Sequence, residues 1–170
     1  MKSAKGLTDS RHELLQFDDV AAMAKFGAFA VRDASEILGL SRRKVLLFVE
    51  QGLVPAWNVQ EVGRGRHRRL SLVGLFRMYV AAELEYLGYT PKPMKPLLEL
   101  VERVGLKSIR KAEGPPEALE ICSDRSGGYI VAEEPGQCSA TVTLNLDVMF
   151  QEFLVLISKR WAGIEENDRG

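Results

Sequence analysis

The chain of 170 residues has few of the residues on which secreted scaffolds and metal sites depend. It contains two cysteines, Cys122 and Cys138, and two histidines. Two cysteines are too few for a disulfide framework and match no paired zinc spacing, so we expect both to be reduced. They are either small buried hydrophobic side chains or sensors of metal or oxidant. Burial is favoured because no cluster of histidines accompanies them.

Long apolar runs are also missing. The opening segment MKSAKGLTDSRHELLQ contains no apolar core of a secretory signal. No later run approaches the roughly 18 apolar residues that cross a bilayer. We therefore expect a soluble, cytoplasmic protein with no membrane partner.

Catalytic fingerprints are absent as well. There is no G-x-S-x-G, P-loop, HExxH or dinucleotide-binding pattern, and two widely separated histidines offer no acid–base pair. The glycines of GRGRH lack the Walker spacing and its Lys-Ser/Thr ending. The sequence thus predicts no enzyme, no catalytic residue, no metal ligand and no cofactor.

Charge is present in equal amounts of both signs, but it is unevenly distributed. Residues 28–110 carry 14 Lys and Arg against 8 Asp and Glu, whereas residues 111–170 carry 5 against 11. A basic middle segment indicates contact with a polyanion, and a chance imbalance of solvated faces is the alternative.

The first part of the chain reads as helices around a tight corner and a hairpin. We expect a helical arm over 1–27, then two short helices separated by Gly39, with Ser41 capping the second and Gly52 ending it. The alternation in WNVQE before Gly63-Arg64-Gly65 predicts a hairpin. Ser71 caps a third helix that Gly88 ends, and a fourth helix has its regular part from near Met94.

The last part of the chain has a different pattern of residues, with short β-prone runs in place of helical spacing. KAEGPPE is a linker, and the short β-prone runs ALEICS, GYIVAE and SATVTLNL predict a β-meander. Asp147 is expected to cap an apolar helix over 148–161 whose last turn carries Lys159 and Arg160. The predicted domains are an arm at 1–27, a DNA-binding domain at 28–107, a linker at 108–116 and a small dimerisation or effector domain at 117–170.

Two short helices, a basic hairpin and a longer helix are the layout of a winged helix-turn-helix. The second helix can enter a major groove with its first turn leading, while the wing follows the neighbouring backbone. Arginine suits both tasks because its planar guanidinium group donates two hydrogen bonds to a phosphate or to a guanine edge. The candidate DNA-binding residues are Arg42, Arg43, Lys44, Arg64, Arg66, His67, Arg68 and Arg69.

From Phe29 to about Val104 the sequence resembles the DNA-binding domain of MerR-type transcriptional regulators. The resemblance rests on FAVRDASEILGLS, RRKVLLFVEQGLVP, GRGRHRRLS and LEYLGYT, in that order. It implies a winged helix-turn-helix of MerR type. With the β-meander and the C-terminal helix that the later residues predict, the expected fold is mainly α with a small α+β part. The resemblance also implies a homodimer that distorts promoter DNA for RNA polymerase, with a nucleoid-associated location, and an effector that acts through the C-terminal region.

The chain departs from the family in two respects. Leu46, Leu47 and Phe48 stand where an arginine and tyrosines are typical, and Val49 stands where an acidic residue is usual. We expect Leu46 and Leu47 to pack against a neighbouring helix rather than contact thymine methyl groups. The long dimerisation helix is also missing.

The apolar helix over 148–161 is the candidate replacement. Because so apolar a helix must be covered, we expect a second copy to cover one side, with burial against the third and fourth helices as the alternative. An architectural DNA-binding protein, similar to excisionases or small terminase subunits, and a degenerate winged-helix interaction module are the alternative functions.

Overall fold

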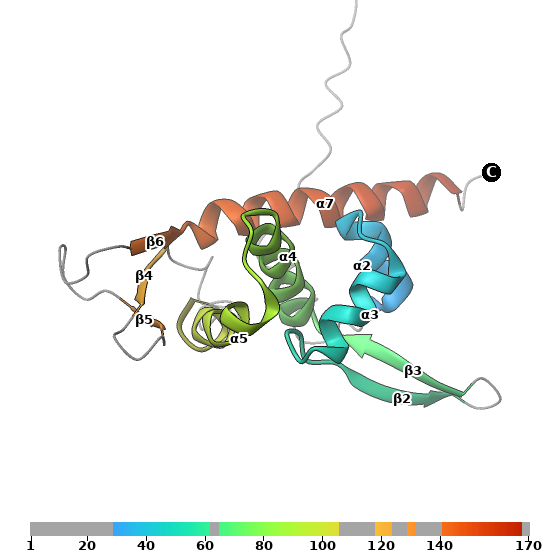
Figure 1. Cartoon of the computed structure of the whole chain (residues 1–170). Helices are drawn as coiled ribbons and strands as arrows, with labels where there is room; N and C mark the ends of the chain where they lie inside the picture. The colour runs from blue at the N-terminus through green and yellow to red at the C-terminus, as the bar shows by residue number, and fades with distance from the viewer. Residues whose placement is uncertain (1–28, 62–64, 106–117, 124–128, 132–140, 168–170) are drawn as a thin grey trace, which may run out of the picture.

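The computed structural model describes residues 29–61, 65–105, 118–123, 129–131 and 141–167 (Figure 1). For 57–61, 65–67, 104–105, 123, 130–131, 141 and 161–167 only the backbone is described. The described part is mostly helical with two three-stranded sheets, which confirms the mainly α class with a small β part. The arm expected before residue 28 and the linker at 108–116 lie outside the described residues.

Helices α2 (Val31–Leu38) and α3 (Arg42–Glu50) form the corner that the sequence predicts. Gly39 has a φ of 64°, a left-handed conformation that glycine adopts without steric cost, so the chain can turn here within three residues. Ser41 then caps α3, because its Oγ accepts the backbone N–H of Lys44 at 3.2 Å. Ala34, Ile37, Val45 and Phe48 are buried where the two helices meet.

A hairpin follows α3. Strands β2 (Trp57–Glu61) and β3 (Gly65–Leu70) pair antiparallel, with Asn58 opposite Arg68 and Glu61 opposite Gly65. The short strand β1 (Phe29–Ala30) pairs with the other edge of β3, which fastens the base of the hairpin next to α2. The expected hairpin is confirmed, and it extends away from the helices on the side opposite the last helix (Figure 1).

Helix α4 (Leu72–Tyr86) is the centre of the fold, with ten buried residues. Ser71 caps it as expected, since its Oγ accepts the backbone N–H of Gly74 at 2.9 Å. Helix α5 (Pro91–Leu100) begins three residues before the expected Met94. The prediction was wrong because proline is tolerated in a first helical turn, whose N–H groups have no helical partner. A π-helical turn, η1 (Val101–Gly105), continues α5.

The second sheet contains β4 (Leu119–Ser123), β5 (Tyr129–Val131) and β6 (Thr141–Leu144). Its order is β5-β4-β6, with both neighbours antiparallel to β4. The expected meander would have placed β5 in the middle, so that prediction was wrong. Strand β4 lies at the centre, and its Leu119, Ile121 and Cys122 are almost inaccessible.

Helix α7 (Leu146–Asn167) is longer than expected and lies across the other helices, from the second sheet to α2 (Figure 1). Its cap is Asn145, whose Oδ1 accepts the backbone N–H of Val148 at 3.4 Å; the expected cap, Asp147, lies inside the first turn. Because the helix runs on to Asn167, Lys159 and Arg160 lie before the last turn rather than in it.

The apolar side of α7 is covered within the chain. Phe150, Phe153, Leu154 and Ile157 are buried, and the rings of Phe150 and Phe153 lie 5.2 Å from that of Phe76 on α4. They belong to one hydrophobic cluster that also includes Phe29, Phe48 and Leu97. These four side chains therefore need no second copy to cover them, and burial against α4 is the observed arrangement.

Candidate nucleic-acid interface

The first turn of α3 presents the strongest local concentration of positive charge in the described chain. Arg42 and Arg43 are exposed, and Lys44 follows them. No acidic residue stands in this turn. Neither arginine side chain forms an ion pair or hydrogen bond with another described residue. Two guanidinium groups thus face solvent at the start of the helix.

Cations at this end of a helix oppose the helix dipole. The N-terminus carries about half a positive charge, and each nearby cation costs about 0.3–1 kcal/mol of stability. The same end attracts anions, because its N–H groups point outward and the dipole favours negative charge. Arg42 and Arg43 are therefore unfavourable for folding and favourable for an anionic ligand.

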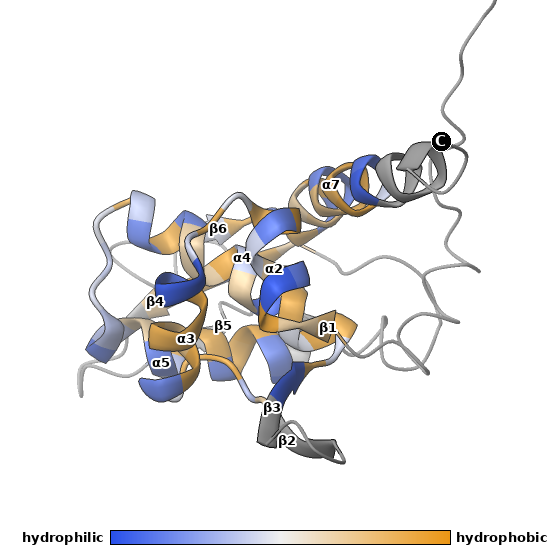
Figure 2. Cartoon of the chain, turned by 90° about the vertical axis from the view of Figure 1, so that its right-hand side faces the viewer, coloured by the Kyte–Doolittle hydropathy of each residue, from blue (hydrophilic) through white to orange (hydrophobic). Residues whose placement is uncertain are grey.

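The hairpin is tied to the opposite end of α3. A guanidinium nitrogen of Arg68 on β3 lies 3.3 Å from a carboxylate oxygen of Glu50, the last residue of α3. The described end of β3 is strongly hydrophilic and lies beside the helices (Figure 2). The pair sets the base of the hairpin against α3, so the two basic elements lie at opposite ends of the same helix.

The remaining candidates lie along the hairpin. Arg69 is half-buried at the base of β3, where it pairs in register with Ala30 and Trp57. Arg66 and His67 stand opposite Gln60 and Val59, and only their backbone is described. Arg64 lies outside the described residues. The structure therefore brings Arg66, His67, Arg68 and Arg69 onto one strand.

Unlike Arg42 and Arg43, Lys44 has its charged group held by other side chains of the chain. Its Nζ donates to a carboxylate oxygen of Glu85, in the last turn of α4, and lies 5.0 Å from the ring centroid of Phe48. The partners are 41 residues apart in sequence, so no helical spacing could have revealed the pair. Helical spacing could not have revealed the pair between Glu50 and Arg68 either, because its partners are 18 residues apart.

Apolar side chains are also exposed at this side of the fold. Leu47 on α3 is 39% exposed, which contradicts the expectation that it packs against a neighbouring helix. Leu46 is half-buried. Tyr86 and Leu87, which follow Glu85 at the end of α4, are 88% and 66% exposed. The helical spacing of Leu84 and Leu87 predicts that Leu87 is buried, and this prediction is wrong because α4 ends at Tyr86.

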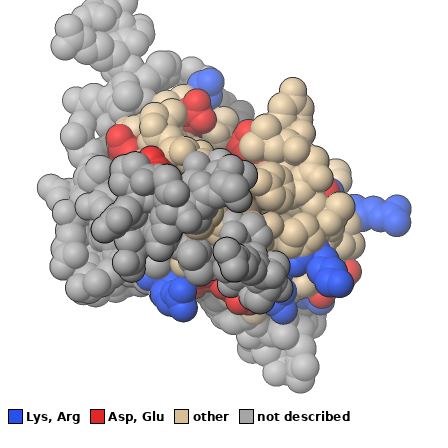
Figure 3. Space-filling model, turned by 60° about the vertical axis from the view of Figure 1, so that its left-hand side comes forward, with Lys and Arg blue, Asp and Glu red and all other residues tan. Residues whose placement is uncertain are grey.

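Basic and acidic side chains alternate along the lower edge of the molecule. Most Lys and Arg side chains visible in Figure 3 lie toward this edge, on the side from which the hairpin extends in Figure 1, and acidic side chains lie between them. The surface is therefore a mixed one in which ion pairs decide which cations remain available.

A buried arginine holds the elements behind this surface together. Arg77 on α4 has an exposed side-chain fraction of only 6%, and its guanidinium pairs with Glu102 in η1. Its Nε also donates to the carbonyl oxygen of Leu53 at 2.5 Å, in the segment between α3 and the hairpin. Arg77 thus joins α4, the π-helical turn and the approach to β2.

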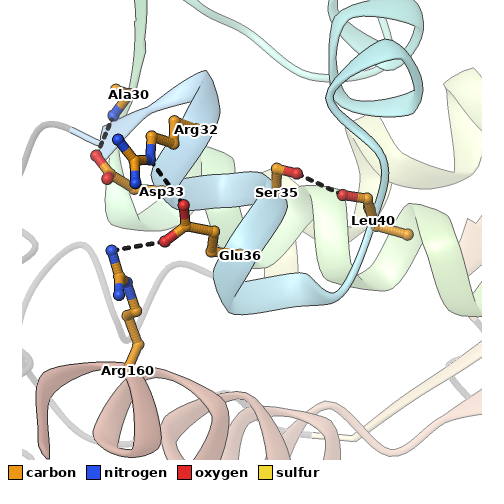
Figure 4. Close-up of polar contacts among 7 residues, drawn as sticks. All are labelled: Ala30, Arg32, Asp33, Ser35, Glu36, Leu40 and Arg160. Atoms are coloured by element: carbon orange, nitrogen blue, oxygen red, sulfur yellow. Dashed lines mark hydrogen bonds and ion pairs between the residues drawn. The ribbon is translucent and has the colours of Figure 1, made fainter. Parts of the chain in front are cut away.

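Helix α7 reaches the first helix of the corner through a second ion-pair network (Figure 4). The carboxylate of Glu36 on α2 accepts from Arg32 at 2.7 Å and from Arg160 on α7 at 2.6 Å. The hydrogen bond from Arg32, followed by the charge of Arg160, holds the pKa of Glu36 below its usual value against the effect of burial.

The contact between α7 and α4 also has a polar part. The hydroxyl of Tyr79 on α4 donates to a carboxylate oxygen of Glu152 on α7 at 2.8 Å. Burial, and then the hydrogen bond to Glu152, raise the pKa of Tyr79 far above its usual value, so the phenol stays protonated. Tyr129 on β5 packs at the edge of the core.

Cys122 is disulfide-bonded, so the expectation of a reduced thiol is wrong for this residue. The chain has one other cysteine, Cys138, which lies outside the described residues. Cys122 lies in the β-prone run ALEICS and Cys138 directly precedes the run SATVTLNL, and no short-range spacing linked the two. Among the residues that the structure describes, no group of three or more His, Cys, Asp and Glu could hold a metal ion.

No helix in the described ranges has both the length and the apolar character needed to cross a membrane. Comparison with known proteins adds no identification, because no protein-family model matches the chain and no curated protein matches it.

Proposed function

We propose that α3 and the β2–β3 hairpin form a winged helix-turn-helix that binds double-stranded DNA. The observation that carries this proposal is the first turn of α3, where Arg42 and Arg43 are exposed and no acidic residue stands. A pair of cations at a helix N-terminus weakens folding, and a phosphate or a guanine edge reverses that effect.

The spacing of the basic elements suits a duplex. Helix α3 has nine residues and is therefore about 13 Å long. A major groove is about 12 Å wide. With its first turn inside the groove, α3 would reach across it, and the hairpin, which the pair of Arg68 and Glu50 holds at the far end of α3, would approach the bordering phosphate strand. This geometry favours α3 as the element that contacts the DNA bases and the hairpin as the element that contacts the DNA phosphates.

The resemblance to MerR-type regulators extends the proposal to transcription. The chain would bind promoter DNA as a homodimer at an inverted repeat and alter its use by RNA polymerase. Because Phe150, Phe153, Leu154 and Ile157 are covered within one chain, the dimer surface would lie elsewhere than on them. The ion pair between Arg160 and Glu36 supports a role for α7 in positioning α2.

Two other functions fit part of the same surface. An architectural protein would bend DNA with the same elements but would not act on a promoter, and promoter footprints and gene neighbours separate the two. An interaction module would bind an acidic protein through Arg42 and Arg43. Such a module would remain folded but bind no DNA even at low salt.

The test compares two pairs of alanine variants in the full chain. Genomic fragments bound by the purified protein are selected and footprinted, and affinity for one selected duplex is then measured over a range of salt concentrations. Replacing Arg42 and Arg43 by alanine should reduce the slope of log K against log salt by about 0.9 for each phosphate that these arginines neutralise. Replacing Lys159 on α7 and Arg103 in η1, which are exposed cations on other elements, is the matched control.

The selected duplex also reports base reading. If either arginine contacts a guanine, its loss should relax selection at that base and cost about 1–3 kcal/mol there. Equal effects of the test pair and the control pair would show that only overall charge matters, and the proposed interface would then be wrong.

A further inference from the structure

The ion pair between Lys44 and Glu85 changes the number of cations that the first turn of α3 offers. Arg42 and Arg43 extend into solvent, whereas the ammonium group of Lys44 is held by the Glu85 carboxylate and lies over the ring of Phe48. The side chains of Lys44 and Glu85 are only 28% and 40% exposed. A ring face adds to the attraction of a cation, so Lys44 has two intramolecular partners.

Glu85 is also a negative charge at the edge of the proposed DNA surface. It lies in the last turn of α4, beside the start of α3, because Lys44 links the two helices there. A carboxylate repels any phosphate strand that approaches Lys44, and Lys44 can reach a phosphate only when its ion pair breaks. Contacts to phosphate carry no sequence information, so releasing Lys44 would strengthen chiefly the complexes with unselected DNA, which lack base contacts and depend on phosphate contacts alone.

We propose that Glu85 is a specificity-determining residue of the α3 surface, because it withholds Lys44 from the phosphate backbone of unselected DNA. Discrimination between partners is a difference of affinities, and a repulsive group that weakens the wrong complexes increases it. This inference rests on the proposed DNA-binding function.

The central measurement is the affinity of Glu85→Gln for a random-sequence duplex. The amide keeps the size of the side chain and removes its charge, which frees Lys44 for one additional phosphate contact. We expect the slope of log K against log salt to steepen by about 0.9 and, near 0.1 M salt, binding to strengthen about eightfold. Affinity for the selected duplex should rise less, so the ratio of selected to random binding should fall.

Two further variants test whether Lys44 is the cause. Lys44→Gln alone should change binding to the random duplex little, because Lys44 is already neutralised. In the double variant Lys44→Gln with Glu85→Gln, the gain from Glu85→Gln should disappear. Glu83→Gln is the matched control, since it removes the same charge from an exposed position two residues earlier on α4.

The outcomes separate this inference from the function on which it rests. If the wild type binds DNA through Arg42 and Arg43 but Glu85→Gln binds the random duplex no better, the role of Glu85 is wrong and the interface stands. An equal gain from Glu83→Gln, or a gain that persists without Lys44, also overturns it. If the wild type binds no duplex, the proposed function fails and the role of Glu85 fails with it. Circular dichroism and thermal unfolding verify that each variant is folded.

Discussion

A guanidinium nitrogen of Arg160 lies 2.6 Å from a carboxylate oxygen of Glu36, and this contact joins the last helix of the chain to the first helix of the corner that carries α3. The same carboxylate also holds Arg32 on its own helix. Glu36 is therefore the point at which α2 meets the C-terminal part of the chain.

Replacing Glu36 by glutamine should loosen α7 from α2, and the effect should depend on pH. The hydrogen bond from Arg32 lowers the pKa of Glu36 in the folded chain, so its stabilising contribution is present at neutral pH and is lost as pH falls through that lowered pKa. The difference in unfolding free energy between wild type and Glu36→Gln should therefore be largest near neutrality and vanish in strong acid. Urea unfolding across pH provides the measurement.

Glu99→Gln is the control for this titration, because Glu99 is an exposed carboxylate on α5. Combining Glu36→Gln with Arg160→Gln separates the interhelical pair from the local one. Additive effects of the two substitutions would show that Arg160 and Glu36 are not energetically coupled.

Arg77→Met should be the most destabilising polar substitution in the described core. It leaves the Leu53 carbonyl oxygen without this donor and Glu102 without its arginine, and breaking a buried ion pair costs about 3–5 kcal/mol. Changing Glu102 to methionine as well should recover part of the loss, because the carboxylate that Arg77 balanced is then gone. Urea denaturation of the two variants measures which is more stable. A double variant that is less stable than Arg77→Met would contradict the prediction.

Phe153→Ala should destabilise the monomer itself. Phe153 is fully buried against Phe76, and removing a buried aromatic side chain costs about 3–5 kcal/mol. Val148→Ala, at a position 48% exposed on the same helix, should change stability by less than about 0.5 kcal/mol. Thermal unfolding of both variants provides the comparison.

Protein concentration tests the same arrangement independently. Because α7 is covered by its own chain, the effect of Phe153→Ala on the unfolding temperature should be the same at about 1 and about 100 µM. An effect that grows with dilution would mean that a second copy completes this part of the core.

Local sequence signals predicted most of the first half of the fold. Gly39 marks the turn, Ser41 and Ser71 cap their helices, and the alternation around Trp57 gives the hairpin, because each of these depends on residues close together in the chain. The regular part of α5 was expected only from near Met94 because the prolines left its first residue uncertain, whereas a first turn accommodates Pro91 and Pro93. Asn145 was overlooked as a cap because Asp147 follows so closely.

The candidate site was predictable only as a set of basic residues. Sequence locates Arg42, Arg43 and Lys44 on the first turn of α3, and local physical chemistry suffices for this because a cap and a helical period define the turn. Which cations remain available was decided by tertiary structure: Lys44 meets Glu85 and Arg68 meets Glu50. Pairs that are 41 and 18 residues apart have no periodic signature, since folding alone brings them together. The same reason explains why the pairing of β6 with β4 and the packing of α7 onto α4 could not be derived from the sequence, whereas the existence of those elements could.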